Sequence, residues 1–150
     1  LQAIELLPDL SRVRVLVASP EPGEVPVPHK VPAERLLARS EQAMAEFYSR
    51  CDIFVLPSRV EGFPLPPLEA MACGCAVVVT ACGGVSDYAQ DGVNCLVVPP
   101  ADPHALAKAV WTLCQDPPLR VRLSEEGLKT ARRFERTRMA ERFLDLLANP

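Results

Sequence analysis

Aromatic residues and histidine are scarce in this sequence of 150 residues. Aromatic side chains make up 5% of it, and the two histidines, His29 and His104, fall in or next to segments expected to be loops. A Ser/His/Asp or Cys/His nucleophile needs a histidine held beside it, and a zinc site needs several clustered ligands. The sequence shows neither pattern, so we expect no nucleophilic triad and no metal site.

Basic residues do not outnumber acidic ones. The chain carries 16 Lys and Arg against 19 Asp and Glu, a net charge of -3. Because nucleic-acid binding needs a concentrated basic surface, we expect no such partner. A late group of arginines is interleaved with glutamates, which indicates a solvated helix face, with contact to an anionic membrane surface as the alternative. The group comprises Arg132, Arg133, Arg136 and Arg138, with Glu135 and Glu141.

Long apolar runs and paired cysteines are also missing. No run approaches the ~20 apolar residues of a membrane span, and no signal-peptide pattern is present. Most of the six cysteines lie in or beside apolar segments, and none forms a C-x-x-C pair, so neither a disulfide framework nor a zinc pattern is supported. We expect buried free thiols and a cytoplasmic protein. The cysteines are Cys51, Cys73, Cys75, Cys82, Cys95 and Cys114.

The length corresponds to about one ordinary domain, large enough for a real core. We therefore expect a single domain over residues 1–150. The chain begins at Leu1 without an initiator methionine and ends just after an apolar helical pattern. We expect it to be a piece of a longer protein.

Apolar spacing predicts alternating helices and strands. Residues 1–7 have helical spacing that stops at Pro8, and residues 13–18 are typical of a strand. The proline-rich residues 20–32 predict a loop. His29 and Lys30 in this loop are either plain exposed residues or contacts to the base or phosphate of a nucleotide. An amphipathic helix is predicted over residues 33–50.

The same alternation continues to the end of the chain. Short continuous apolar runs are typical of parallel strands buried on both faces, and strands alternating with helices indicate a doubly wound parallel sheet of the α/β class. Asp before Pro predicts the start of a helix at two positions. The predicted strands are residues 53–56, 76–80 and 95–98, and the predicted helices are residues 66–73, 103–114, a helix from 117, and 137–147.

The segment from Leu56 to Gly74 has the layout of a binding site. A strand leads into a loop with Glu61, and the loop leads into a short helix with Glu69, seven residues intervening. Two prolines open that helix and Gly74 suits its end. Because a helix N-terminus attracts anions, we expect an anionic ligand. The plainer interpretation is that Glu61 is a loop anion and Glu69 an early-helix acid favoured by the helix dipole.

Several motifs in this order carry a family resemblance. They are EGFPLPPLEAMACG at residues 61–74, GG at 83–84, DG at 91–92 and LVVPP at 96–100. Together they resemble the C-terminal, donor-binding lobe of a group 1 (family 4-like) glycosyltransferase, over residues 46–147. The resemblance implies a Rossmann-like lobe that forms the C-terminal half of a GT-B architecture. It also implies retaining transfer of a sugar from a nucleoside diphosphate, with no metal or other cofactor.

The resemblance assigns a role to each motif residue. Glu61 would be the catalytic residue at the donor sugar, and Glu69 would accept hydrogen bonds from the ribose hydroxyls. Backbone N–H groups of Gly62, Phe63 and Leu65 would face the sugar and the diphosphate. The acceptor, a sugar, lipid or other molecule, would be held by an N-terminal lobe that this sequence lacks, with peripheral membrane contact as an option.

This sequence departs from the usual family pattern at three positions. Pro64 stands where Gly is usual, Asp87 where Glu is usual, and Cys95 where Gly is common. The family's first strand of this lobe, and a basic Arg/Lys pair near it, are expected before Leu1. The departures leave sugar specificity open. Two other functions also stay open: a non-catalytic nucleotide-sugar-binding module, and a sugar-nucleotide epimerase with the same two-lobed fold.

Overall fold

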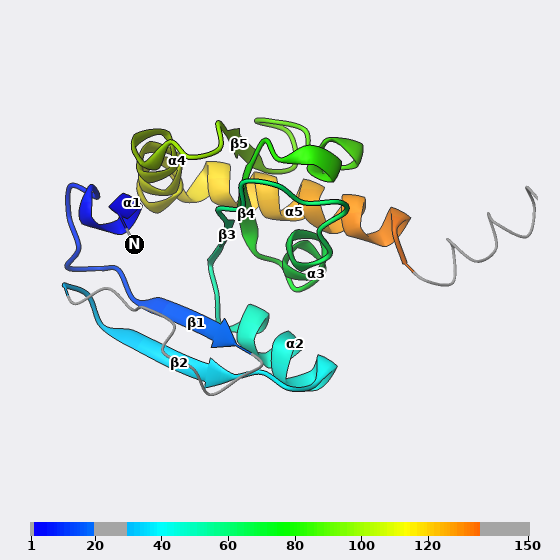
Figure 1. Cartoon of the computed structure of the whole chain (residues 1–150), viewed down its shortest axis with the longest axis horizontal. Coiled ribbons are helices and arrows are strands. Elements are labelled where there is room, and N and C mark those ends of the chain that lie inside the picture. Colours follow the sequence, from blue (N-terminus) through cyan, green and yellow to red (C-terminus); the bar gives the residue numbers. More distant parts are fainter. Residues whose placement is uncertain (1, 20–29, 136–150) are drawn as a thin grey trace, which may run out of the picture.

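A computed structural model describes residues 2–19 and 30–135 of the chain (Figure 1). These residues form parallel strands connected by helices, as the alternating pattern predicts. In chain order the elements are α1 (Gln2–Glu5), β1 (Val15–Ser19), β2 (Ala33–Leu37), α2 (Glu41–Ser49), β3 (Ile53–Leu56), α3 (Pro66–Ala72), β4 (Ala76–Thr80), the 3-10 helix η1 (Gly83–Asp87), β5 (Leu96–Val98), α4 (Pro103–Gln115) and α5 (Pro117–Arg133).

The described strands belong to two separate parallel sheets. β1 pairs with β2, with Val15 opposite Ala33, and β4 lies between β3 and β5 in the second sheet. Figure 1 shows the first sheet below the second, with α2 beside the end of β1. The α/β class with parallel strands is therefore confirmed. Within the described residues the strands form two sheets.

Helices cover both faces of β4. Val77 and Val79 point into a cluster with residues of α2 and α3, whereas Ala76 and Val78 point into a cluster with residues of α4 and α5. Every residue of β4 is buried, as expected for a parallel strand between two helical layers. This double covering is the doubly wound arrangement, and it surrounds the strand whose carboxyl end leads to the Gly83-Gly84 loop.

The prediction of one helix over residues 33–50 is wrong in its first part. Residues 33–37 form β2, and the helix α2 begins only at Glu41, after Ser40, whose side chain accepts a hydrogen bond from the Ala43 N–H. Leu36 and Leu37 suit a helix by propensity, but parallel pairing with β1 decides their conformation, since tertiary contacts outweigh weak local preference.

Most other boundaries are confirmed within a few residues. Asp102 and Asp116 cap α4 and α5 by accepting hydrogen bonds from the N–H groups three residues later, and Gly74 ends α3 with a φ of 84°. The predicted helix over residues 137–147, His29, and most of the predicted loop at residues 20–32 lie outside the described residues.

Candidate functional site

The candidate site is the loop between β3 and α3, with the residues around it. Glu61 lies midway along this loop, and its Oε1 accepts a hydrogen bond from the Ser58 hydroxyl at 2.7 Å. Glu61 is half-buried. The loop therefore holds one carboxylate in a fixed position at the carboxyl end of a parallel strand, where α/β proteins bind ligands.

Two buried side chains fasten the loop to the sheet that carries it. The Thr80 hydroxyl, at the end of β4, donates a hydrogen bond to the Ser58 carbonyl. The Tyr88 hydroxyl donates to the Pro64 carbonyl at 2.9 Å. Burial, followed by the effect of nearby thiols, raises the pKa of Tyr88, so this phenol remains a donor. The loop is thus held near both ends from the C-terminal side of the sheet.

The Gly83-Gly84 loop lies directly against the Glu61 loop. The Gly84 N–H donates to the Glu61 carbonyl at 3.4 Å. A Cβ atom placed on Gly84 would lie 1.7 Å from the Gly62 carbonyl oxygen, and one on Gly83 would lie 2.3 Å from that of Glu61. Only residues without a side chain allow this approach, so the two glycines let two loops meet at the carboxyl ends of β3 and β4.

Glu69 lies in the first turn of α3 and is exposed, but one of its oxygens is anchored. The Tyr48 hydroxyl donates a hydrogen bond to Glu69 Oε2 at 2.9 Å. Tyr48 comes from α2 and is 1% exposed. Burial and then the Glu69 carboxylate raise the pKa of Tyr48, because both disfavour a phenolate. The phenol stays protonated and the carboxylate keeps its partner.

The loop offers more free backbone N–H groups than the N-terminus of α3 does. Within residues 30–135, the N–H groups of Gly62, Phe63 and Leu65 donate to no protein acceptor. The first two residues of α3 are Pro66 and Pro67, which have no N–H to offer. An anion at this position would therefore meet the loop amides rather than a full set of helix N-terminal amides.

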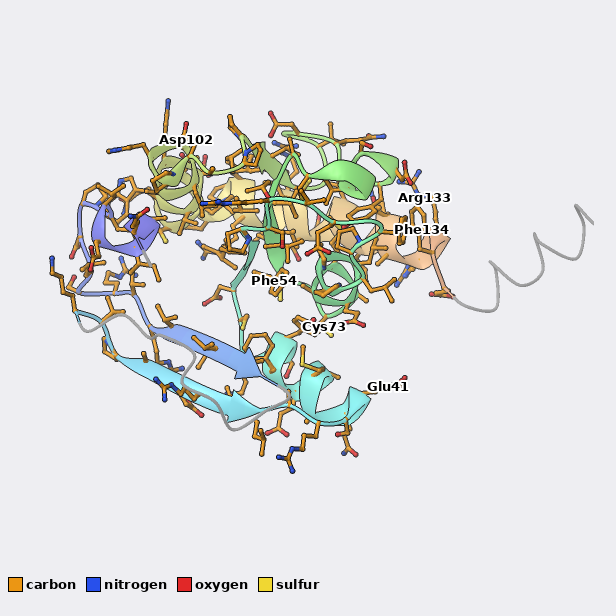
Figure 2. The ribbon with its side chains drawn as sticks, in the orientation of Figure 1. Glu41, Phe54, Cys73, Asp102, Arg133 and Phe134 are labelled. Carbon is orange, nitrogen blue, oxygen red and sulfur yellow. The ribbon has the colours of Figure 1, made fainter. Side chains whose placement is uncertain are left out.

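Phe63 connects the loop to the end of α5. Its ring is 42% exposed and makes an edge contact with Tyr88, with centroids 5.6 Å apart. The ring of Phe134 lies 5.9 Å from that of Phe63 and 6.0 Å from that of Tyr88. Figure 2 shows Phe134 at the end of the described part of the chain. Residues far apart in sequence therefore shape the outer wall of the site.

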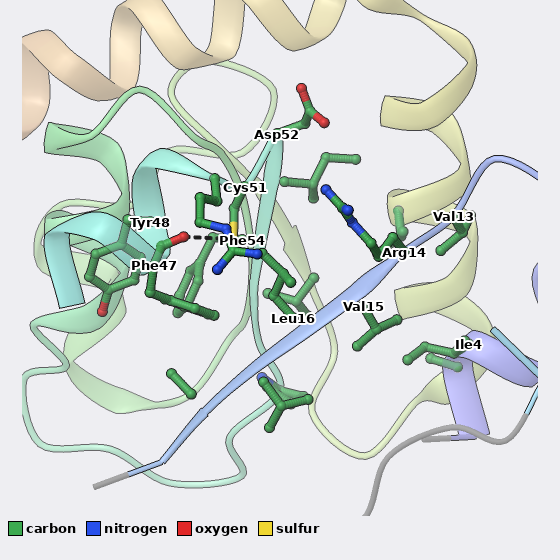
Figure 3. A pocket seen from close by; sticks show the side chains of 18 of the residues that line it. Ile4, Val13, Arg14, Val15, Leu16, Phe47, Tyr48, Cys51, Asp52 and Phe54 are labelled. Atoms are coloured by element: carbon green, nitrogen blue, oxygen red, sulfur yellow. Dashed lines mark hydrogen bonds between the residues drawn. The ribbon is translucent and has the colours of Figure 1, made fainter. Parts of the chain in front are cut away.

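A separate cavity of about 860 Å³ lies between the two sheets (Figure 3). The edges of β1 and β3 that bear no strand partner among the described residues face it, together with parts of α1, α2 and α4. Neither Glu61 nor Glu69 lines it, but Tyr48 does. The cavity is mostly apolar and is distinct from the paired glutamates.

The three departures from the family pattern have different surroundings. Pro64 is buried and its carbonyl holds the Tyr88 hydroxyl, whereas Asp87 is exposed at the end of η1. Cys95 is fully buried in the core. Burial raises the pKa of its thiol to about 12. Of the three, Pro64 is the one that bears directly on the shape of the loop.

Sequence reasoning found both glutamates and the double glycine but missed the residues that hold them. Tyr48 falls within the amphipathic helix predicted over residues 33–50, and no role is predicted for Ser58, Thr80 or Tyr88. A phenol on an otherwise apolar helix face is a usable signal, because a buried Tyr hydroxyl needs a hydrogen-bond partner. Lys30 is exposed.

The described part of the chain offers neither a cluster of metal ligands nor a membrane-spanning helix. No three side chains of His, Cys, Asp or Glu there converge as metal ligands would. None of the helices described has the length and hydropathy needed to cross a membrane. All six cysteines are free thiols.

Three known proteins illustrate what this chain is similar to. An N-acetylgalactosaminyltransferase of Campylobacter jejuni, which acts on N,N'-diacetylbacillosaminyl-diphospho-undecaprenol according to its name, is 36% identical over 109 residues. That match covers 73% of this chain and 28% of the relative, so the chain spans less than a third of its length.

Two solved structures resemble the fold. The C-terminal domain of the group 1 glycosyltransferase LpcC from Francisella tularensis is 33% identical, with a TM-score of 0.59, over 67% of this chain and 51% of that one. HepE of Anabaena in complex with UDP-glucose is 22% identical, with a TM-score of 0.70, over 81% of this chain and 33% of that one. At 22% identity the likeness to HepE shows the fold alone.

The family model for glycosyl transferases of group 1 matches residues 34–130. This range runs from the second residue of β2 through most of α5, and it includes both glutamates, the double glycine and the tyrosines that hold the site. The structural neighbours have the GT-B fold, of which this chain corresponds to the C-terminal half. The chain therefore belongs to the group 1 glycosyltransferases.

Proposed function

We propose that this chain is the donor-binding lobe of a two-lobed, retaining glycosyltransferase that takes its sugar from a nucleoside diphosphate. The observation that carries the proposal is the anchored Glu69 carboxylate beside a loop with open amides and a second carboxylate, Glu61. One carboxylate can bridge a vicinal diol, and uncommitted N–H groups suit phosphate or sugar oxygens. Neighbours of the same fold have been solved with UDP and UDP-glucose, which supports a nucleotide-sugar donor.

We assign each group the role that the family resemblance implies. Glu69 accepts hydrogen bonds from the ribose hydroxyls, and the loop amides of Gly62, Phe63 and Leu65 bind the diphosphate and sugar. Glu61, held by Ser58, lies at the reacting sugar. Catalysis in this scheme is positional and electrostatic, because fixed donors and a closed site stabilise the leaving diphosphate without a bound metal.

The acceptor would be held by another lobe, since this chain spans only 28% of the Campylobacter relative. The diphospho-undecaprenol compound in the name of that relative makes a lipid-linked acceptor, reached by peripheral contact with a membrane, one option for this protein. We place the protein in the cytoplasm, where its free thiols would stay reduced. Alone, the described chain should transfer no sugar, because acceptor pocket and closure come from elsewhere.

Calorimetric titration with UDP, GDP and ADP, in the complete protein that carries this sequence, tests the proposal. Glu69→Ala should weaken binding of the preferred nucleotide by about 1.5–3 kcal/mol, the range for a hydrogen bond to a charged group. Glu61→Ala should leave nucleotide affinity nearly unchanged and lower turnover in a transfer assay with the matching sugar nucleotide.

Two results would contradict the assignment. Equal loss of nucleotide binding in both variants would mean that the two glutamates have been given the wrong roles. Donor binding without transfer in the unaltered complete protein would favour a non-catalytic nucleotide-sugar-binding module.

A further inference from the structure

Two buried tyrosines hold two different parts of the site. Tyr48 and Tyr88 are 1% and 3% exposed, and each phenol donates one hydrogen bond of 2.9 Å. Tyr88 donates to a backbone carbonyl of the loop, that of Pro64. Tyr48 instead donates to a side-chain carboxylate, that of Glu69 in α3. Of the two, Tyr48 is therefore the one that fixes a flexible, charged side chain.

The position of the Tyr48 hydroxyl is fixed by its surroundings. The ring makes edge contacts with Phe47 and Phe54, with centroids 5.3 and 5.4 Å apart, and the Tyr48 carbonyl accepts a hydrogen bond from the Cys75 thiol. Phe54 belongs to β3, and Cys75 immediately precedes β4. The ring of Tyr48 is thereby held against β3, and its backbone is held by the residue that precedes β4.

Glu69 needs such an anchor because it is exposed and long. A free Glu side chain has up to about 2 kcal/mol of rotamer entropy to lose on binding. The carboxylate offers about four acceptor positions, and Tyr48 occupies one of them, on Oε2. In the described residues, Oε1 has no protein donor, so that oxygen stays open toward solvent.

We propose that Tyr48 is a positioning residue that sets recognition of ribose: it holds Glu69 in one rotamer by Oε2, so that Oε1 is presented to the vicinal hydroxyls of a nucleoside diphosphate. The inference rests on the proposed function, since it requires that Glu69 binds the ribose. It assigns selectivity for a ribose diol to a buried phenol that never touches the ligand.

The substitution Tyr48→Phe separates this role from a structural one. The ring and its contacts are kept, and Glu69 Oε2, being on an exposed residue, can return to water instead of remaining buried without a partner. The urea unfolding midpoint should therefore stay close to that of the unaltered protein. Tyr88→Phe is the matched control, because it removes a phenolic hydroxyl that is equally buried but bonds the loop.

The measurement is the ratio of dissociation constants for a nucleoside diphosphate and its 2′,3′-dideoxy counterpart. UDP, GDP and ADP would each be titrated beside the dideoxy form in the complete protein. Tyr48→Phe should weaken binding of the ribose form by about three- to tenfold, as expected for one hydrogen bond and lost preorganisation, and leave the dideoxy form unchanged. Tyr88→Phe should leave the ratio as it is.

A double variant tests whether Tyr48 acts through Glu69. In a Glu69→Ala background, Tyr48→Phe should have no further effect on the ratio, because its action runs through that carboxylate. If the unaltered protein binds none of the three nucleotides, the proposed function fails. If it binds and distinguishes ribose from dideoxyribose, yet Tyr48→Phe keeps the ratio or Tyr88→Phe changes it equally, the role of Tyr48 is refuted.

Discussion

The central strand β4 of the second sheet and the strand β2 of the first sheet differ sharply in burial. In β4 the exposed fraction is zero for Ala76 through Val79 and 3% for Thr80. In β2 four of the five residues are exposed, and Leu37 is 50% exposed. Both strands have parallel partners, so pairing alone does not bury a strand. β4 is central and has helices on both faces, whereas among the described residues β2 pairs only with β1.

The residues of the candidate site follow strands of the second sheet, which has β4 at its centre. Glu61 follows β3, Glu69 lies in the next helix, and the double glycine follows β4. The first sheet touches this body through Leu16, Ala18 and Leu36, which are only partly buried against the core. The central strand β4 is closely packed by helices on both faces, and loops that follow such a strand are held more firmly than loops on an exposed strand.

The largest expected effect contrasts one leucine from each region. Leu123 in α5 is fully buried against the second face of β4, so Leu123→Ala should lower the free energy of unfolding by about 2–5 kcal/mol. Leu37→Ala in β2 makes the same chemical change at a half-exposed position and should stay within about 0.5 kcal/mol. Urea denaturation followed by circular dichroism measures both.

An equally large cost at Leu37 would contradict the contrast. It would mean that the first sheet is covered in solution by another surface, and that its exposure is not a property of the folded protein.

A smaller loss of stability is expected when Gly84, one of the glycines of the site, is replaced by alanine. In Gly84→Ala the new Cβ would lie 1.7 Å from the Gly62 carbonyl oxygen, a backbone atom, so the two loops must separate. Overpacking of this kind costs about 1–3 kcal/mol, and donor binding should be lost with it. Gly62→Ala is the control for stability, because nothing lies within 4 Å of its added Cβ. Equal midpoints of thermal unfolding would show that the loops do not meet.

The smallest expected effect is a loss of stability at alkaline pH, caused by two buried thiols beside the strands of the second sheet. Burial raises the pKa of Cys75 and Cys95 to about 12 from 9.0. A raised folded-state pKa means that the unfolded chain loses these protons first as pH rises. The contribution of the thiols to stability is therefore complete below pH 9 and is lost progressively between pH 9 and about 12.

Urea midpoints measured from pH 8 to 10 should fall for the unaltered protein and fall less steeply in a Cys75→Ala, Cys95→Ala variant. The slope is the diagnostic quantity, since the small cavities left by the two substitutions lower stability at every pH. A slope unchanged by the double substitution would mean that other groups cause the alkaline loss. Tyr48 and Tyr88, whose pKa values are also raised, would then be the first to test.

Local chemistry in the sequence was enough to locate most of the second sheet and the candidate site. Continuous apolar runs, Asp-Pro at helix starts and Gly74 at a helix end act within a few residues, so they can be read directly. Glu61 and Glu69 stood out because their motif is contiguous. Pro66 and Pro67 were correctly predicted to begin the helix. Because proline has no N–H, they also remove donors that were expected at the N-terminus of this helix.

Partners distant in sequence were decided only by the tertiary structure. Residues 33–37 became a strand because β1 offered a parallel partner, against their helical propensity. Tyr48 became the anchor of Glu69, 21 positions later, because α2 packs against α3. Gly84 became the neighbour of Gly62 because the strands that precede them, β4 and β3, pair side by side. Such contacts depend on how whole helices and strands pack. A local sequence pattern therefore does not show which distant residues will come together.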